Sequence, residues 1–380
     1  MPNLHASFLR LLLTLACVVV PQTLAAQSEP KSSEPKSSEP RSSGPSESID
    51  VASHVDSLPT RIGLGSCIRQ DRDQPIWEAV LLDKPDLFIL LGDNIYGDSE
   101  DPEILQAKYE ALASNPGFAR LRKQCPLIAI WDDHDYGVND GGLEYPTKQK
   151  SQELFNDFFN VAPDSPRRSR PGIYDDMIFS DGDQTLQIIL LDTRYFRSPL
   201  RRVRSAGNGI GPYGPDESPS ATMLGEAQWT WLESALQKPA DLRIIASSIQ
   251  FASDQHGWEC WGTFPKEQQR MVDLIEKTKA RGVVFLSGDR HKAEISKLPA
   301  NDTSLPYDLY DLTSSSLNQP SGSAHRYEEN PFRVGNQFHQ VNFGTIDIDW
   351  KSGKLTLGLK DVTGRTVEAT TIDFPGQDRG

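Results

Sequence analysis

The sequence predicts an α/β protein in which most residues form one domain. From Arg61 onward, short apolar runs alternate with amphipathic stretches, a pattern typical of strands joined by helices. From Val341 the chain instead alternates apolar and polar residues one by one, which predicts antiparallel hairpins that extend or pack on the main sheet. With 380 residues, 37% of them hydrophobic, the chain can bury a large core.

The N-terminal residues have the pattern of an export signal. Residues 1–26 contain the apolar run Phe8–Val20 followed by small residues at Ala25 and Ala26, so we expect a cleaved signal peptide and a secreted or periplasmic protein. The run is shorter than the ~20 residues of a bilayer span, so no permanent membrane span is expected. No twin-arginine pair precedes it, which disfavours that export route. Residues 27–57 repeat Ser, Pro and Glu and predict a disordered linker, followed by the main domain at 58–380.

Hydrophobic periodicity gives the elements of this domain in order. Strands are expected at Arg61–Gly65, Leu87–Leu91, Leu127–Trp131, Leu186–Leu191, Leu242–Ser247 and Val283–Ser287. Helices are expected at Gln74–Leu82, Pro102–Ala113, Gln152–Phe159, Glu226–Leu236 and Lys266–Lys279. The pair Asp101-Pro102 has the cap-then-proline order of a helix start. The stretch Arg197–Ser220, rich in Gly, Pro and Arg, predicts a long excursion of the kind that often lies beside a site.

The charge balance limits the partners of this domain. There are 53 acidic and 39 basic side chains, a formal net charge of -14. Such a field repels polyanions, so nucleic acid is not an expected partner. A phosphate-bearing substrate therefore requires metal cations or a local arginine cluster.

Residues able to bind metal follow several of the predicted strands. Asp93 and Tyr96 come after Leu87–Leu91, and Asp133, His134 and Asn139 come after Leu127–Trp131. Carboxyl ends of strands are where α/β sheets place ligands, and consecutive buried acids need an ion to neutralise them. The simpler alternatives are a helix cap at Asp93 and a structural Ca²⁺ loop or plain surface acids near Asp133.

Two further segments add candidate ligands and leave their alternatives open. Asp289 and His291 follow Val283–Ser287 with the two-residue spacing that points both side chains to one side of an extended segment. Cys67 follows Arg61–Gly65 and is either a thiolate ligand or half of a disulfide, for which Cys125 and Cys260 are the other candidates.

Arginine and aromatic residues suggest how a substrate could be held. Arg194 could contact a phosphate with its guanidinium fork, or form a structural ion pair with Asp192. His256, Trp258 and Trp261 could line a substrate cleft.

Together the motifs GSC, GDNIYGD, WDDHDYGVND, LDTRYFR, SSIQF with WGTFP, and SGDRH resemble the alkaline phosphatase D (PhoD-like) family of the calcineurin-like metallophosphoesterases. They run in unbroken order from about Arg61 to His291. The resemblance implies a four-layer αββα sandwich with a dinuclear or larger metal centre. It implies that Cys67, Asp93, Tyr96 and His291 bind Fe³⁺, with Asp93 bridging to a second metal.

At that second site, Asp133 and Asp289 stand where many relatives have Asn and His, and Asn139 is a further candidate ligand. Harder oxygen donors favour Ca²⁺ or another hard divalent ion, and Zn²⁺ or Mn²⁺ could occupy one or both positions.

The function expected from the resemblance is that of an exported metal-dependent phosphoesterase. It would hydrolyse phosphomonoesters and/or phosphodiesters, including phospholipid-like diesters, by a metal-activated hydroxide. His134 would protonate the leaving alkoxide and Arg194 would contact the phosphoryl oxygens. The alternative from another class is a secreted non-catalytic protein that binds metal or phosphate. A hydrolase with Cys67 as nucleophile is disfavoured because no base lies beside that cysteine in sequence.

Overall fold

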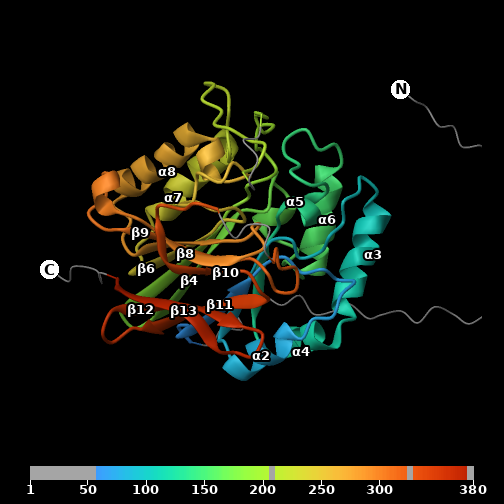
Figure 1. Ribbon diagram of the computed structural model, residues 1–380, viewed down its shortest axis with the longest axis horizontal. Helices are drawn as coiled ribbons and strands as arrows, with labels where there is room; N and C mark the ends of the chain where they lie inside the picture. The colour runs from blue at the N-terminus through green and yellow to red at the C-terminus, as the bar shows by residue number, and fades with distance from the viewer. Residues whose placement is uncertain (1–56, 205–209, 323–327, 375–380) are drawn as a thin grey trace, which may run out of the picture. The chain divides into compact units, whose positions relative to one another are not determined.

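Two β-sheets lie face to face, and helices cover the outer side of each (Figure 1). The computed structural model describes residues 57–204, 210–322 and 328–374; the predicted signal peptide and nearly all of the predicted linker lie outside these ranges. Among the described residues, no helix has both the length and the apolar character needed to cross a membrane.

The first sheet has six strands in the order β13-β12-β11-β1-β2-β3. Its members are β1 (Arg61–Gly65), β2 (Leu87–Leu91), β3 (Leu127–Ile130), β11 (Asn342–Asp349), β12 (Lys354–Asp361) and β13 (Thr366–Asp373). Strands β1, β2 and β3 are parallel, and β11 pairs with β1 in the antiparallel direction. The hairpins predicted for the C-terminal part therefore extend the main sheet.

The second sheet has seven strands in the order β10-β8-β9-β7-β6-β5-β4. Its members are β4 (Asp175–Asp181), β5 (Gln184–Leu190), β6 (Leu242–Ala246), β7 (Val283–Ser287), β8 (Ala293–Leu298), β9 (Leu309–Ser314) and β10 (Arg333–Phe338). Strands β5, β6, β7 and β9 are parallel, so their carboxyl ends lie at one edge.

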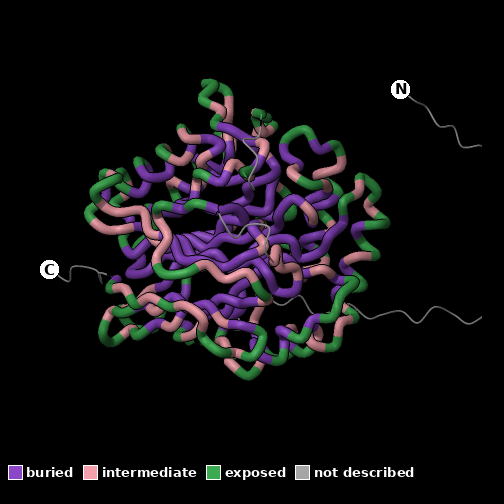
Figure 2. Tube along the Cα trace, in the orientation of Figure 1, coloured by how far each residue is buried: buried purple, intermediate pink, exposed green. Residues whose placement is uncertain are grey.

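Successive side chains of the central strands point to opposite faces of the sheet, so the apolar core has two parts. Ile188 and Ile244 belong to the core that joins the two sheets, whereas their neighbours Ile189 and Ile245 belong to the core under two helices. Those helices are α7 (Gly225–Leu236) and α8 (Pro265–Thr278). Figure 2 shows the resulting buried strands at the centre of the molecule. These strands are apolar on both faces because both faces are covered.

The remaining helices pack beside the first sheet. They are α2 (Ile76–Asp83), α3 (Pro102–Ala113), α4 (Pro116–Gln124), the single turn α5 (Asp133–Tyr136) and α6 (Lys148–Phe158). Short 3₁₀ turns lie at Pro166–Arg168, Trp261–Thr263 and Ala300–Asp302. The architecture confirms the predicted αββα sandwich.

Most predicted elements agree with the structure. The bounds of β1, β2, β7 and α3 agree residue for residue, and the other predicted elements differ by a few residues at their ends. Strands β4, β8, β9 and β10 and helices α4 and α5 were not expected. Strand β10 is only partly buried and contains Gly335, so it lacks the clear alternation that predicts a strand.

Candidate metal centre

The carboxyl ends of strands from both sheets meet at one edge of the sandwich. An isolated bridge pairs Ser66, just after β1, with Ser315, just after β9. Backbone hydrogen bonds reinforce it, since Leu317 N donates to Ser66 O at 2.9 Å. This junction brings the segments after β1, β2, β3 and β7 to one place.

Four predicted ligands form the first cluster. The Cys67 Sγ lies 3.3 Å from Asp93 Oδ2, and the Tyr96 hydroxyl lies 3.2 Å from the same oxygen. The Tyr96 hydroxyl is also 2.9 Å from His291 Nε2. Thiol, carboxylate, phenol and imidazole groups thus surround one point, although they come from three separate segments.

A second cluster adjoins the first through Asp93. Ligand atoms of Asp132, Asp133 and Asp289 lie within 4.8 Å of one another, and so do those of Asp93, Asp133 and His134. The Asp133 carboxylate is held in place because its Oδ2 accepts from Asp140 N at 2.7 Å and its Oδ1 from His134 N at 2.9 Å. The two clusters share Asp93, as a bridging ligand would require.

Several of these ligands adopt left-handed backbone conformations. Cys67, Asp93, Asp289 and His291 have φ values of 61°, 51°, 65° and 53°. Such conformations are uncommon for residues other than glycine and gather at functional sites. Gly92, at φ 97°, is required because an added Cβ would lie 2.5 Å from Asp132 Cβ.

The clusters carry negative charge that the surrounding protein does not fully offset. Burial raises the pKa of the Asp93 and Asp132 carboxyls well above their usual range, and that of Asp289 to about 7. The Oδ1 of Asp93 and the Oδ2 of Asp132 are buried with no hydrogen-bond partner among the described residues. Orphaned carboxylate oxygens beside thiol, phenol and imidazole donors fit a cation-binding site.

His134 lies at the mouth of these clusters with its side chain 15% exposed. Its Nδ1 is 2.6 Å from Asp98 Oδ1, and its ring lies against Tyr96 with centroids 4.2 Å apart. Burial lowers the pKa of His134, but Asp133, Asp93 and Asp98 outweigh that effect and raise it to about 11. The imidazole is thus a proton carrier fixed beside the candidate metal ligands.

Arg194 occupies a different environment from the one expected. Its side chain is fully buried, with Nε 2.6 Å from Asp132 Oδ1 and Nη1 2.5 Å from Glu259 Oε2. Asp192, the alternative ion-pair partner, accepts from the backbone N of Arg194 at 2.9 Å and forms no ion pair with its guanidinium. The guanidinium fork is fully engaged by protein carboxylates, so direct phosphate contact by Arg194 is not supported by its position.

Asn139 is exposed, and its Nδ2 donates to Asp140 Oδ2 at 2.8 Å. Instead, Asp140 and Glu259 come within 4.8 Å of Asp133. Neither acid is among the predicted ligands. Asp140 directly follows Asn139 in the same acidic motif, and Glu259 lies between Trp258 and Trp261, which were expected to line a cleft.

Two of the three residues expected to line a substrate cleft, His256 and Trp261, are buried. Trp261 is fully buried in the core under α7 and α8, while Trp258 is half-buried with Arg290 Cζ 5.4 Å from its ring centroid. Cys67, Cys125 and Cys260 are all buried free thiols, so the disulfide alternative does not apply to the described residues.

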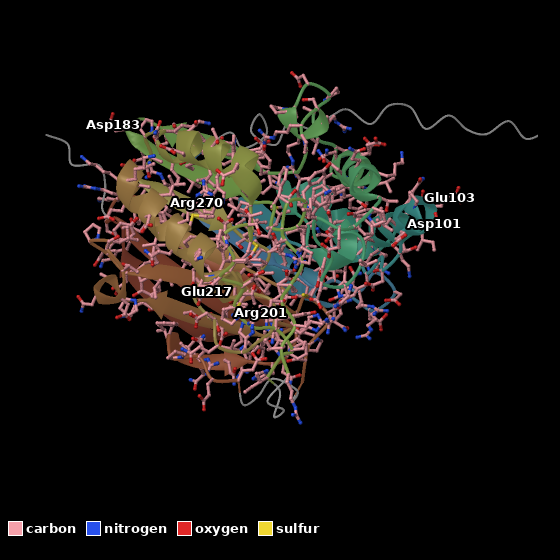
Figure 3. All side chains as sticks on the ribbon, turned by 90° about the horizontal axis from the view of Figure 1, so that it is seen from above. Asp101, Glu103, Asp183, Arg201, Glu217 and Arg270 are labelled. Atoms are coloured by element: carbon pink, nitrogen blue, oxygen red, sulfur yellow. The ribbon has the colours of Figure 1, made fainter. Side chains whose placement is uncertain are left out.

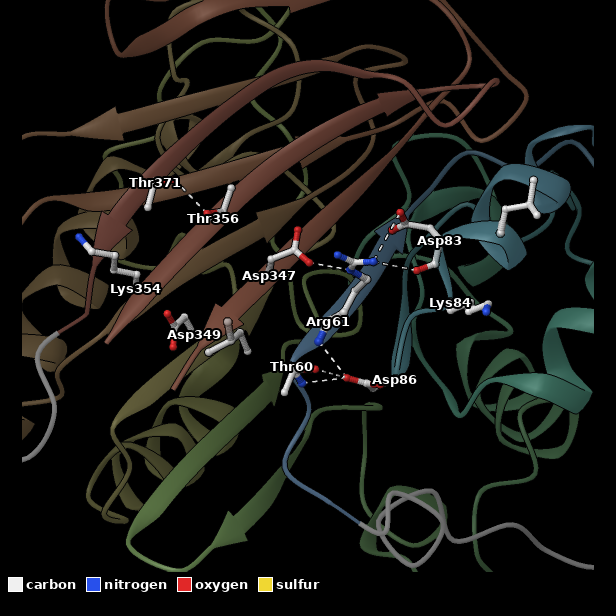
Figure 4. A pocket seen from close by; sticks show the side chains of 12 residues that line it. Thr60, Arg61, Asp83, Lys84, Asp86, Asp347, Asp349, Lys354, Thr356 and Thr371 are labelled. Carbon is white, nitrogen blue, oxygen red and sulfur yellow. Dashed lines mark hydrogen bonds and ion pairs between the residues drawn. The ribbon is translucent and has the colours of Figure 1, made fainter. Parts of the chain in front are cut away.

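A second recess lies at the opposite end of β1 and has a different character. This groove of about 660 Å³ is lined by Arg61, Asp83 and Asp347, among others (Figure 4). Arg61 Nε donates to Asp347 Oδ1 at 2.6 Å, so the charges there pair within the protein. None of the predicted ligands lines this groove.

The fold has two sheets packed face to face, and Asp, His, Cys and Tyr side chains gather where the strands end. This combination of fold and site is that of a metallophosphoesterase-like protein. The chain belongs to the PhoD-like phosphatase family, whose model matches residues 66–359. This match confirms the predicted family.

Individual relatives are more distant. Alkaline phosphatase D of Bacillus subtilis (strain 168) is 26% identical over 192 residues, which are 46% of this chain and 32% of that protein. The chain thus matches about a third of that curated relative's length.

Solved structures agree in fold. A structure of PhoD matches with a TM-score of 0.66 at 18% identity, covering 83% of this chain and 73% of its own. GAP50, described as the anchor in the inner membrane complex of Plasmodium, matches with a TM-score of 0.54 at 12% identity, covering 85% and 91%. At these identities the two structures bear on the fold alone.

Proposed function

We propose that this protein is an exported, metal-dependent phosphoesterase. The observation that carries the proposal is the convergence of Cys67, Asp93, Tyr96 and His291 on one point, with Asp133 and Asp289 beside it. Buried carboxylate oxygens without partners make this donor set suitable for cations. The sequence of residues 1–26 supports export.

The donor types favour different ions at the two positions. Thiolate, phenolate, imidazole and carboxylate groups of Cys67, Tyr96, His291 and Asp93 suit Fe³⁺. Carboxylates of Asp133 and Asp289, sharing Asp93, suit Ca²⁺ or another hard divalent ion, and Zn²⁺ or Mn²⁺ are further candidates. The chemistry that such ions supply is Lewis acidity toward phosphoryl oxygens and activation of a water nucleophile.

The protein's own groups would support the departure of the leaving group. Attack of water on phosphorus breaks the ester P–O bond, and the departing alkoxide needs a proton. His134 is placed to donate it, because Asp98 orients its Nδ1 and nearby carboxylates keep it protonated. Arg194 acts as a positioning residue, since it holds Asp132 and Glu259 beside the clusters.

The proposed substrates are small phosphomonoesters and phosphodiesters, the latter including phospholipid-like molecules. A nucleophilic role for Cys67 is not supported. Its side chain is fully buried, and burial raises the pKa of the thiol to about 11.

A secreted, non-catalytic metal- or phosphate-binding protein is the second candidate. The burial of Arg194 favours it, because an arginine free to contact phosphate would have argued for catalysis. His134 favours the esterase, since metal binding alone does not need a proton donor held by Asp98.

The test combines metal analysis with turnover. Wild-type protein and the His134→Ala variant are assayed for bound metals and for hydrolysis of p-nitrophenyl phosphate and its bis-ester. We expect two or more bound metals, turnover by the wild type, and a fall in kcat of about 10²–10⁴-fold in the variant with its metals retained. Bound metal without turnover of either ester would favour the binding protein, and no bound metal would refute the site.

A further inference from the structure

The described part of the excursion Arg197–Ser220 packs against the rim of the candidate metal centre. Gly211 N donates to His256 O at 2.8 Å, and Tyr213 N donates to Gly257 O at 2.9 Å. The contact requires glycine, because a Cβ added to Gly211 would lie 2.1 Å from Gly257 O. Figure 3 shows Arg201 and Glu217, two exposed residues that mark where this excursion lies at the surface.

Tyr213 connects the excursion to the acidic clusters. Its side chain is 5% exposed, and its hydroxyl donates to Asp140 Oδ2. Asp140 in turn donates its backbone N to Asp133 Oδ2 at 2.7 Å, and its carboxylate lies within 4.8 Å of those of Asp133 and Glu259. Tyr213 is therefore fixed one residue away from a predicted metal ligand.

Arg202 lies on the outer side of Tyr213. The two residues face each other across an antiparallel bridge, with Arg202 Cζ 5.2 Å from the Tyr213 ring centroid and Nη2 3.3 Å from its hydroxyl. Stacking on an aromatic ring and a hydrogen bond to its hydroxyl hold the guanidinium in place before any ligand arrives.

Arg202 has no carboxylate partner among the described residues, unlike the other arginines near the site. Arg194, Arg197 and Arg290 each form ion pairs with a buried glutamate. Arg202 is exposed and forms no ion pair within the described ranges. In a chain of net charge -14, an ordered and unpaired guanidinium beside an acidic centre is suited to receive an anion.

We propose that Arg202 is a specificity residue that binds a second anionic group, a carboxylate or a further phosphate, in the leaving part of the substrate. The proposal rests on the proposed phosphoesterase function. The scissile phosphate would lie at the metal ligands, and Arg202 is separated from Asp133 by Tyr213 and Asp140, so it would meet the leaving part and not the scissile group.

A matched pair of substrates tests this role. 3-Phosphoglycerate and glycerol 3-phosphate are phosphomonoesters of similar size that differ in one carboxylate. We expect Arg202→Ala to lower the ratio of the kcat/KM for 3-phosphoglycerate to that for glycerol 3-phosphate by about 10-fold or more, mainly through KM. Arg202→Lys should recover only part of the ratio, because lysine lacks the stacked planar fork.

The control is Arg201→Ala, which removes a neighbouring exposed arginine whose Nη1 donates to Pro215 O at 3.0 Å and which does not stack on Tyr213. This variant should keep the wild-type ratio.

Titration calorimetry with each compound gives a second measurement that does not depend on turnover. Weaker binding of 3-phosphoglycerate alone in Arg202→Ala would support the anion contact even if wild type hydrolyses neither compound. The phosphoesterase function itself would be refuted only if wild type also failed to hydrolyse p-nitrophenyl phosphate and its bis-ester. Hydrolysis of both compounds with a ratio unaffected by Arg202, or an equal loss for both, would overturn the specificity role.

Discussion

His134 is the residue whose environment matters most for the proposed chemistry. Sequence reasoning identified it because it stood among acids directly after an apolar strand. The structure adds the partner that orients it, Asp98, which lies 36 positions earlier and carries no sequence signal of this contact. Side-chain contacts between distant loops depend on the fold, so such a partner could not be read from the sequence.

The pH dependence of the unfolding free energy should reflect the carboxylates that surround His134. Its pKa is raised from 6.5 to about 11 in the folded protein. A raised pKa means that the folded state holds the proton more tightly, so this stabilisation is fully present below about pH 6.5 and is lost as the pH rises through about 11. In chelator-treated protein, the unfolding free energy of wild type relative to His134→Gln should fall across this interval, as urea titrations would measure. A difference independent of pH would contradict the assignment.

Arg194 and Asn139 show the limit of prediction at this scale. An arginine after a strand and an asparagine in an acidic motif have plausible roles in the family resemblance. The structure buries the first between Asp132 and Glu259 and leaves the second exposed. Residue type suggests what a side chain can do, while burial decides what it can reach.

At the scale of single elements, strands buried on both faces were the easiest to predict. β1, β2 and β7 are short runs of apolar residues with little ambiguity, and their bounds were correct. β8 was missed because it contains Glu294 and Lys297; Glu294 is fully buried in ion pairs with Lys292 and Arg333. A strand whose charged residues pair across the fold has no apolar pattern to detect.

The turn after β2 should be highly sensitive to a single added methyl group. Gly92→Ala introduces strain at φ 97° and a 2.5 Å contact with Asp132 Cβ, so we expect a loss of about 3 kcal/mol or more in unfolding free energy, together with reduced metal binding. Gly364→Ala is the control. Its φ is 81°, but an added Cβ meets nothing closer than Ala79 Cβ at 3.9 Å, so only strain of about 1–2 kcal/mol is expected. Equal losses would show that the contact is irrelevant.

At the scale of the whole molecule, the site exists only because two sheets are held in register. The motifs could be identified in the sequence, and each was expected at the carboxyl end of a strand, where α/β sheets place ligands. Their convergence, however, depends on the bridge between Ser66 and Ser315. Asp192 adds a second link, since its Oδ1 accepts from Trp131 Nε1 at 2.9 Å and its Oδ2 from Ile173 N at 2.9 Å.

Asp192→Asn should weaken the connection between the sheets. Asp192 Oδ1 also accepts from the backbone N of Arg194 and Tyr195, so an amide with one donor group would face donors that need acceptors. We expect about 2–4 kcal/mol of lost unfolding free energy, measured by urea denaturation. Asp183→Asn, in the exposed β4–β5 turn, is the comparison and should change little. A small effect at Asp192 would mean that this link contributes little to holding the sheets together.

Metal removal should destabilise the entire domain. The ligands come from strands of both sheets, so ions that bind only the folded state stabilise it by mass action, about 2.7 kcal/mol at a hundredfold excess over Kd. Chelation should therefore lower the melting temperature, and restored metal should recover it. Asp133→Asn should reduce the size of this shift. A melting temperature unaffected by chelator would argue against resident metals.

The left-handed turns at the ligands restrict which substitutions evolution or an engineer can use there. Among residues with a side chain, Asn, Asp and His tolerate this conformation best, and all three carry oxygen or nitrogen atoms able to bind metal. A random change that keeps the turn at Asp93, Asp289 or His291 therefore tends to supply another donor. Such positions can exchange the preferred ion while the loop survives, so this backbone makes metal preference easier to alter than metal binding itself.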